Sequence, residues 1–291
     1  MMDQAELLRL LELRQIHHAN SKRFQRKPPR PPRPTYPLTI EREYRKAVIG
    51  IAQELKKATA SILIPELPRL QNESREELGL THIKDSWYGD LEGLIDQIKV
   101  VVGRKWTKAE LEALATRNGF AVAAFAKKYL DQSAKKVLGV NTFASNPGLT
   151  GIMQAFAKNN ASLITSVEDQ YLDQIKNLAF TAFRTGQRWE DLRDEIFQRY
   201  DVSESRAELI ARDQIGKLNA QINEVQQVSL GVVSYTWRTS LDERVRDSHA
   251  ALEGKTFFWN DPPSIDGREL HPGEDYQCRC TAEPVLDGFF E

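Results

Sequence analysis

Residues 234–254 read SYTWRTSLDERVRDSHAALEG, and residues 271–280 read HPGEDYQCRC. At the start of the first stretch, Val233, Tyr235 and Trp237 alternate with polar residues, which is the period of a half-buried strand. The chain upstream follows a helical period instead. The stretch therefore predicts the point where the chain changes from helices to strands, and this change decides the fold class.

Short elements and turns alternate downstream of this predicted strand. A turn at Leu241 and Asp242 precedes a predicted helix over 245–252, a strand over 256–259, a loop rich in proline and glycine, and a last strand over 278–285. We interpret residues 232–285 as a small α+β module with a few antiparallel strands, and call them the C-terminal module.

Helical periodicity runs through residues 39–231 almost without a break. A long apolar run from Leu209 to Val228 predicts a long helix packed on the C-terminal module. The predicted fold class is therefore mainly α, with a helical body followed by a small C-terminal α+β module of few antiparallel strands. Two further apolar stripes predict buried helix faces: Val48, Ile51, Ala52 and Leu55 in one, and Trp87, Leu91, Leu94, Ile95, Ile98 and Val102 in the other.

Capping residues predict where several of these helices begin and end. Gly186 and Gly231 stand where two apolar patterns stop, and are predicted to end helices in a left-handed conformation. Three pairs have the side chains and spacing of reciprocal N-terminal caps, so each is predicted to open a helix: Thr107 with Glu110, Ser166 with Asp169, and Ser205 with Glu208.

Composition limits the class of protein. The chain has 291 residues, with 40 Lys and Arg against 41 Asp and Glu, and only two cysteines. A near-neutral balance excludes a molecule that binds nucleic acid over its whole surface, so such a role needs a local patch. Scarce cysteine excludes a secreted disulfide scaffold and indicates a reducing compartment. No apolar run reaches membrane-spanning length, and residues 1–20 form an amphipathic helical pattern without a signal core, so we expect no membrane partner and a protein that starts in a cytosol.

Residues 21–38 form a basic, proline-rich arm. No acidic residue occurs between Glu12 and Glu41, and six prolines predict an extended polyproline-type chain. The arm suits DNA phosphates or an acidic groove of a partner, and the alternative is a solvated spacer. Its six basic residues are Lys22, Arg23, Arg26, Lys27, Arg30 and Arg33.

The two cysteines, Cys278 and Cys280, are separated by one residue, and we expect no disulfide between them because the small ring would be strained. They are thiols or metal ligands. With His249 and His271 they could form a two-Cys, two-His zinc site, although the spacing fits no standard zinc finger. The alternative is that the cysteines are small buried hydrophobic residues and the histidines bind loop carbonyls or nearby aspartates.

The run from Asp242 to Asp247 combines both signs of charge, which favours a brace within its turn over a reactive site. Arg246 is predicted to pair with Asp242 or Asp247, the carboxylates nearest in sequence, and Arg244 belongs to the same run. Paired carboxylates beside a histidine could instead bind a divalent ion for phosphodiester cleavage. The sequence contains no phosphate-binding glycine loop, G-x-S-x-G or H-E-x-x-H motif, so no catalytic residue is assigned.

Roughly residues 170–286 resemble the Mu F-type head morphogenesis family, the minor head proteins of tailed bacteriophages. The match is in the order of its elements: the aromatic strand 234–237, then the basic pair after Asp242, then His249 and Gly254, then His271-Pro272-Gly273 and Cys278-Arg279-Cys280. Leu209 to Arg212 is similar to the helix that leads into the family's module. Asp213 and Gln214 depart from the Thr-Glu-like pair expected there, so no function is assigned to them.

The resemblance implies a structural virion component and not an enzyme. It implies assembly in the host bacterial cytoplasm, a place in the head interior, contacts with the portal protein and other head proteins, and a role in head assembly or in delivery of the packaged DNA. No cofactor follows from it, and zinc is the one that the residues suggest. The rival hypothesis is a metal-dependent nuclease or related hydrolase packaged in the head, using His249, Asp247, Asp242 and His271. The predicted domains are 1–38 (helix and arm), 39–165 (helical body) and 166–291 (Mu F-like domain).

Overall fold

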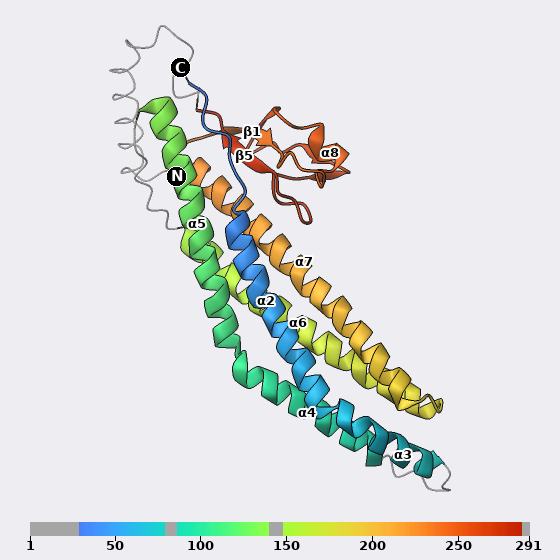
Figure 1. Cartoon of the computed structure of the whole chain (residues 1–291). Helices are drawn as coiled ribbons and strands as arrows, with labels where there is room; N and C mark the ends of the chain where they lie inside the picture. Colours follow the sequence, from blue (N-terminus) through green and yellow to red (C-terminus); the bar gives the residue numbers. More distant parts are fainter. Residues whose placement is uncertain (1–28, 79–85, 140–147, 287–291) are drawn as a thin grey trace, which may run out of the picture. The chain divides into compact units, whose positions relative to one another are not determined.

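A computed structural model describes residues 29–78, 86–139 and 148–286 (Figure 1). The predicted helix over 1–20 and four arm residues, Lys22, Arg23, Arg26 and Lys27, lie outside the described residues. The predicted fold class is confirmed, because long helices are followed by short antiparallel strands. The helices of the body are α2 (Leu38–Ile62), η1 (Ile64–Glu66), α3 (Leu67–Leu78), α4 (Ser86–Lys105), α5 (Lys108–Leu138), α6 (Gly148–Arg184) and α7 (Trp189–Ser229).

The chain divides into two compact units, each assembled from separate segments. Helices α2, α5, α6 and α7 contribute residues to both units. The boundary predicted at residue 165 falls inside α6, and the three linear domains remain a prediction about separable parts of the chain. Unit 1 comprises 1–40, 117–156 and 213–291, and unit 2 comprises 41–116 and 157–212.

The caps show where local sequence signals decide helix ends. Thr107 and Glu110 form the predicted reciprocal cap before α5, with the Thr107 amide donating to Glu110 Oε2 at 2.7 Å and the Glu110 amide donating to Thr107 Oγ1 at 3.3 Å. Gly186 and Gly231 follow α6 and α7 with φ of 76° and 80°, as predicted. The prediction that Ser166 and Ser205 open helices is wrong.

Ser166 lies inside α6, and Ser205 lies inside α7. The Ser166 hydroxyl donates to the Leu163 carbonyl at 2.7 Å, a bond that serine makes within a helix as readily as it caps one. Because apolar residues continue on both sides of each serine, the tertiary packing of the helix overrides the cap signal.

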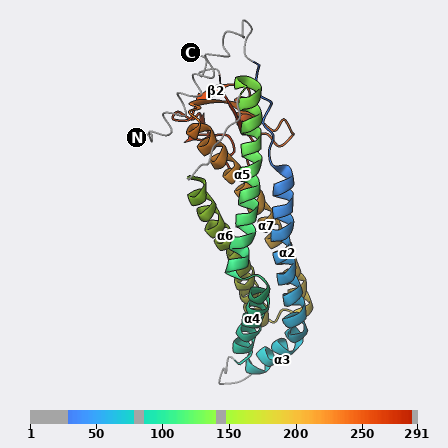
Figure 2. The same cartoon turned by 90° about the vertical axis from the view of Figure 1, so that its left-hand side faces the viewer.

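Unit 2 has a core formed by the predicted apolar stripes. The stripes on α2 and α4 are buried except for Leu94, which is half-buried, and α3 packs beside α4 in both views (Figures 1 and 2). Two buried polar contacts sit in this core: the Tyr44 hydroxyl donates to Asn160 Oδ1 at 2.8 Å, and Glu41, 1% exposed, lies 3.6 Å from the Arg212 guanidinium. Tyr44 and Glu41 therefore tie α2 to α6 and α7 within this unit.

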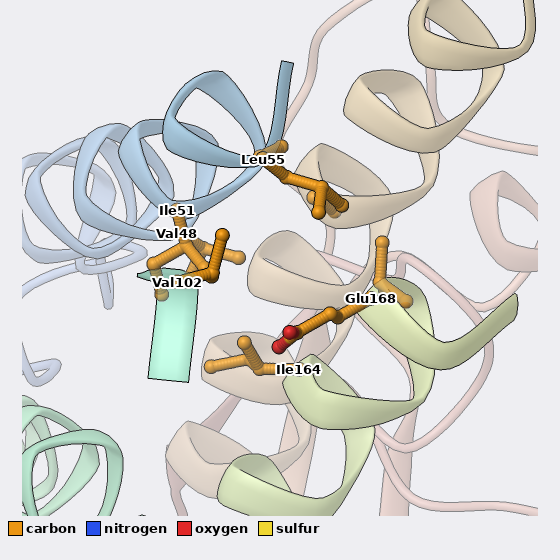
Figure 3. Close-up of a pocket in the computed structure, with 9 residues that line it drawn as sticks. Val48, Ile51, Leu55, Val102, Ile164 and Glu168 are labelled. Carbon is orange, nitrogen blue, oxygen red and sulfur yellow. The ribbon is translucent and has the colours of Figure 1, made fainter. Parts of the chain in front are cut away.

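A small hollow lies among the stripe residues of unit 2 (Figure 3). Its lining includes Val48, Ile51, Leu55, Val102 and the carboxylate of Glu168. Its volume is about 10 Å³, the space of one water molecule at most. Burial, followed by the charge of the neighbouring Asp169, raises the pKa of Glu168. The hollow is a packing defect and too small for a ligand.

The C-terminal module contains a three-stranded antiparallel sheet of order β2-β1-β5 and a separate β3-β4 hairpin. Tyr235 and Trp237 on the central strand are both 0% exposed, so the predicted burial of Trp237 is confirmed. In the register, Trp237 pairs with Ala282 and Tyr235 pairs with Phe257 on the opposite side. The elements are β1 (Ser234–Arg238), α8 (Asp247–Ala250), β2 (Thr256–Phe258), β3 (Ser264–Ile265), β4 (Arg268–Glu269) and β5 (Thr281–Pro284).

The last strand is shorter than predicted. It begins at Thr281, so that Cys278 and Cys280 lie in an irregular loop that joins the module's apolar core. The predicted helix over 245–252 reduces to the four residues of α8. Both differences follow from turns that the sequence did not signal, including a left-handed Gln277 with φ of 53°.

The C-terminal part of α7 packs directly on the module, as the apolar run predicted. A Cβ added at Gly216 would lie 2.9 Å from the Cys278 carbonyl oxygen, so only glycine allows this approach. Gln227 donates to the Ala282 carbonyl at 3.0 Å, and the Gln277 amide donates to Asp213 Oδ1 at 2.9 Å. The helix therefore positions the loop that carries both cysteines.

Candidate metal centre

His249, Cys278 and Cys280 form a buried cluster in the C-terminal module. The Nδ1 atom of His249 lies 3.4 Å from Cys278 Sγ and 3.6 Å from Cys280 Sγ. The three side chains offer ligand atoms that all lie within 4.8 Å of one another. The residues are 2%, 6% and 4% exposed, respectively. Among the described residues, this is the one such group of three or more His, Cys, Asp and Glu side chains.

Local turns bring these residues together. Arg246 is extended at the start of α8, and the following single helical turn directs His249 inward. The Cys278 amide donates to the Asp275 carbonyl at 3.1 Å, which closes a turn before the cysteines. The Cys280 amide then donates to Cys278 Sγ at 3.3 Å. An amide that points at a sulfur stabilises negative charge on it.

Asp275 lies behind the histidine. Its Oδ2 atom is 3.2 Å from His249 Nε2, and the residue is 5% exposed. Three further donors hold its carboxylate: Arg246 at 2.8 Å, Arg268 at 2.7 Å and the Tyr276 amide at 2.8 Å. Burial opposes ionisation, but these donors outweigh it and lower the pKa of Asp275. An ionised Asp275 fixes the imidazole with Nε2–H toward the carboxylate and Nδ1 toward the sulfurs.

The cluster also polarises its own thiols. Hydrogen bonding from Cys280 holds the pKa of Cys278 well below its usual range, against the effect of burial, and His249 acts in the same direction. The contact with Cys278, together with burial, raises the pKa of Cys280. The contact with Cys278 raises the pKa of His249. The Cys278 sulfur therefore carries the anionic character of the cluster.

His271 lies apart from this cluster. Its Nδ1 is 2.9 Å from the Tyr235 hydroxyl, and its ring centroid is 5.0 Å from that of Trp259. Its backbone amide donates to Glu274 Oε2 at 2.6 Å. The structure thus brings together three of the four residues proposed from the sequence. The fourth residue, His271, contacts Tyr235 on β1, whereas His249 contacts Trp237 on the same strand.

Arg246 does not pair with a carboxylate of its own turn, and that prediction is corrected. Its guanidinium binds Asp275 and donates to the Tyr276 carbonyl at 2.7 Å. Asp242 instead accepts from the Arg244 amide at 3.1 Å, while Asp247 starts α8 and is exposed. Arg246 does not pair with the carboxylates nearest in sequence because the loop around residue 275 brings Asp275 and the Tyr276 carbonyl within its reach.

The residues of the rival nuclease hypothesis are dispersed. His249 faces Asp275 and the cysteines, His271 faces Tyr235, and Asp242 braces a turn near Arg279, 3.8 Å away. Within the part of the chain that the structure describes, no group of three metal-ligating side chains contains Asp242, Asp247 or His271.

A charged network on the sheet was missed by the sequence analysis. Arg238 on β1 donates two parallel hydrogen bonds to Glu283, at 2.9 and 3.0 Å, and one to Glu253 at 3.2 Å. Glu253 also accepts from the Thr239 amide at 2.6 Å and pairs with Arg33 at 3.0 Å. Arg238 lies one residue beyond the predicted strand 234–237 and extends it, and no local sequence pattern identifies Glu253 or Glu283 as its partners.

The described part of the arm makes contacts within unit 1. Pro34 and Pro37 are buried, and the Tyr129 hydroxyl donates to the Pro32 carbonyl at 3.0 Å. Arg33 pairs with Glu253 and donates to the Thr239 carbonyl at 3.0 Å, whereas Arg30 is exposed. Of the six basic arm residues, Arg33 is therefore committed to a contact within the protein.

Comparison with known proteins relates this region to phage proteins. Residues 173–283 match the family described as Phage Mu protein F like protein. A Haemophilus influenzae protein, described as uncharacterized, is 37% identical over 175 residues, which is 58% of this chain and 38% of that protein. An Enterococcus faecalis protein named NAD(+)--arginine ADP-ribosyltransferase EFV is 24% identical over 131 residues, 41% of this chain and 27% of that protein.

The chain thus matches well under half the length of either relative. No solved structure matches the chain. None of the helices in the described ranges is long and apolar enough to span a membrane. The family match, residues 173–283, includes α7 and nearly all of the C-terminal module. His249, Cys278 and Cys280 therefore lie inside the matched region.

Proposed function

We propose that this protein, whose residues 173–283 form a Phage Mu protein F like region, is a minor head protein of a tailed bacteriophage. The observation that carries the proposal is that family match, which spans the long helix α7, strands β1 to β4 and all but the last residue of β5. In this role the protein is made in the host cytoplasm, joins the head during assembly with few copies, contacts the portal and other head proteins, and resides in the head interior.

The structure is compatible with a role built on contacts. Long helices present extended surfaces, while the C-terminal module fixes its loops with ion pairs and buried polar groups. A structural protein needs no reactive site, and the cluster at His249 is buried.

Co-assembly tests the proposal directly. The chain is expressed with the portal and capsid proteins encoded by the same genome, and the lysate is separated on a density gradient. We expect the protein to sediment with procapsids, and with portal rings when the capsid protein is left out. A protein that stays at the top of both gradients, while procapsids form normally, contradicts the proposal.

The basic arm is the part that we propose to contact packaged DNA. Lys22, Arg23, Arg26, Lys27 and Arg30 place five positive charges within nine residues of a chain that is near-neutral overall. Arg33 is left out because Glu253 engages it. A partner with an acidic groove would use the same charges, and duplex DNA added as a competitor separates the two.

An enzymatic function is the second candidate, favoured only by the name of the Enterococcus relative. The match covers 27% of that protein, so the likeness is to a part of it. A nuclease assay on linear DNA and an NAD⁺ hydrolysis assay test the two activities. Cleavage that depends on divalent ions and is lost in His249→Ala would replace the structural role with the nuclease hypothesis.

A further inference from the structure

We propose that His249, Cys278 and Cys280 bind a zinc ion through one imidazole nitrogen and two thiolates, with Asp275 holding the histidine from behind. This inference concerns the C-terminal module itself and does not depend on the role in the phage head. It replaces the four-residue set suggested by the sequence, because His271 contacts Tyr235.

Ligand spacing is the first argument. Zinc bonds sulfur at about 2.3 Å and nitrogen at about 2.0–2.1 Å in tetrahedral geometry, which separates a bound nitrogen from a bound sulfur by about 3.6 Å. The two observed Nδ1–Sγ distances are 3.4 and 3.6 Å. A single ring nitrogen has one lone pair or one proton, so it can hydrogen-bond well to only one thiol. A cation between the three atoms satisfies both sulfurs at once.

The second argument is the support behind the ligands. Metal-bound histidines almost always donate their other N–H to a carboxylate or carbonyl. Here Nε2 of His249 faces Asp275, and Arg246, Arg268 and the Tyr276 amide fix that carboxylate in turn. Four groups from three segments thus set the orientation of one imidazole. The amide of Cys280 directed at Cys278 Sγ supports the thiolate in the same way.

The chemistry of the ligands selects the ion. Two thiolates and an imidazole are soft and intermediate donors, which suit zinc and exclude magnesium and calcium, whose ligands are oxygens. No fourth His, Cys, Asp or Glu joins the cluster among the described residues, so the fourth position is filled by water or another small ligand. With all three protein ligands buried, the ion serves to join α8 to the loop before β5.

A small module gains most from such a link. Its strands are two to five residues long, and short elements bury little apolar surface. Binding a metal in the folded state alone adds its binding free energy to the stability of that state. Removal of the ion should therefore lower the melting temperature of the module more than that of the helices.

Metal content of the full chain tests the site. Protein purified under reducing conditions is analysed by mass spectrometry for metals, and the metal-free protein is titrated with Zn²⁺ against a chromophoric chelator. We expect about one zinc per chain. Co²⁺ should give the intense visible bands of a tetrahedral site and a sulfur-to-metal charge-transfer band. These measurements on the unaltered chain do not depend on whether a variant folds.

Matched variants locate the ion. His249→Ala, Cys278→Ser and Cys280→Ser should abolish stoichiometric binding, while His271→Ala, in the same module, should keep it. Asp275→Asn should bind with about 10- to 100-fold lower affinity. The inference is overturned if the reduced unaltered chain neither contains nor takes up zinc, or if His271→Ala loses the ion as completely as His249→Ala. Failure to join procapsids, with zinc retained, would instead count against the proposed function alone.

Discussion

Trp237 is the side chain on which the core of the C-terminal module depends. It is 0% exposed on β1, the central strand of the sheet, and its ring centroid lies 5.7 Å from that of His249 and 6.3 Å from that of Phe257. Trp237→Ala should cost about 3–5 kcal/mol and unfold the module. Thermal melting followed by near-ultraviolet circular dichroism measures this loss. Phe258→Ala on β2, where the side chain is 53% exposed, is the control, and equal losses from both variants would contradict the assignment of the core.

Glu253 makes the module sensitive to acid. Burial acts to raise its pKa, but hydrogen bonds from the Thr239 amide, from Arg33 and from Arg238 outweigh burial and lower the pKa to about 2. A carboxylate with a lowered pKa stabilises the folded state above its unfolded pKa near 4.5, and this stabilisation is lost as the pH falls toward 2.

Comparison with Glu253→Gln isolates this contribution. At pH 7 the unaltered protein should exceed Glu253→Gln in unfolding free energy by at most roughly 3 kcal/mol, since the side chain is partly exposed. The difference should shrink between pH 4.5 and 2, measured by denaturant titration at each pH. Glu269→Gln, at an exposed position on β4, should show no such trend. A constant difference across this range would mean that Glu253 contributes through shape and not through charge.

At the scale of elements, the approach of α7 to the cysteine loop depends on a single glycine. Glycine inside a helix normally costs about 1 kcal/mol relative to alanine. Replacing a helical glycine by alanine therefore usually stabilises a protein. At Gly216 we expect the opposite, because the added Cβ would lie 2.9 Å from the Cys278 carbonyl oxygen, a backbone atom. Gly216→Ala should therefore destabilise the protein by about 1–3 kcal/mol. Gly93→Ala in α4, where nothing lies within 4 Å, should be neutral or stabilising, and the same sign for both variants would contradict this packing.

Helix caps give a second comparison at this scale. Thr107→Ala should cost about 0.5–2 kcal/mol because it removes a reciprocal cap before α5. Ser166 was also predicted to cap a helix, but it lies inside α6. Ser166→Ala should therefore change stability by less than about 0.5 kcal/mol. Equilibrium unfolding in urea measures both. A cost for Ser166→Ala as large as that for Thr107→Ala would show that α6 is divided at that residue.

Elements with a local sequence pattern are predictable, whereas elements that depend on distant contacts are not. Helical stripes such as that of Leu55 repeat within one element, so the pattern alone identifies the buried face. Cap signals are shorter, and Ser166 shows that they fail where apolar residues continue on both sides. The strand at Trp237 was predicted because its alternation is local. The start of β5 was not, because a turn at Gln277 with positive φ carries no glycine signal.

The candidate site was only partly predictable, because some of its contacts join residues that are far apart in sequence. Cys278, Cys280 and His249 stand out because thiols and imidazoles are rare in this chain. Whether a histidine joins them depends on long-range packing, and His271 instead meets Tyr235, 36 residues away in sequence. Arg246 and Asp275 are 29 residues apart, so proximity in sequence pointed to the wrong partner.

For the molecule as a whole, charge limits where the proposed contact with DNA can lie. The chain is almost neutral, with 40 basic against 41 acidic residues, so affinity for duplex DNA must come from a local cluster of charges. The arm offers six basic residues, and Arg33 is paired with Glu253 at 3.0 Å. Five charges remain, for which the logarithm of the binding constant should fall with the logarithm of salt concentration at a slope of about −4.5 if all contact phosphates.

Two variants of the full chain separate binding from folding. Replacement of Lys22, Arg23, Arg26, Lys27 and Arg30 by Gln should bring the salt slope near zero and leave the melting temperature unchanged. Arg33→Gln should do the opposite, because it breaks a contact with Glu253 and the Thr239 carbonyl inside unit 1. Fluorescence anisotropy with a labelled duplex at several salt concentrations measures the slope. If the variant with all five replacements keeps the salt slope of the unaltered protein, the arm is a spacer. The DNA affinity then lies in the body of the molecule.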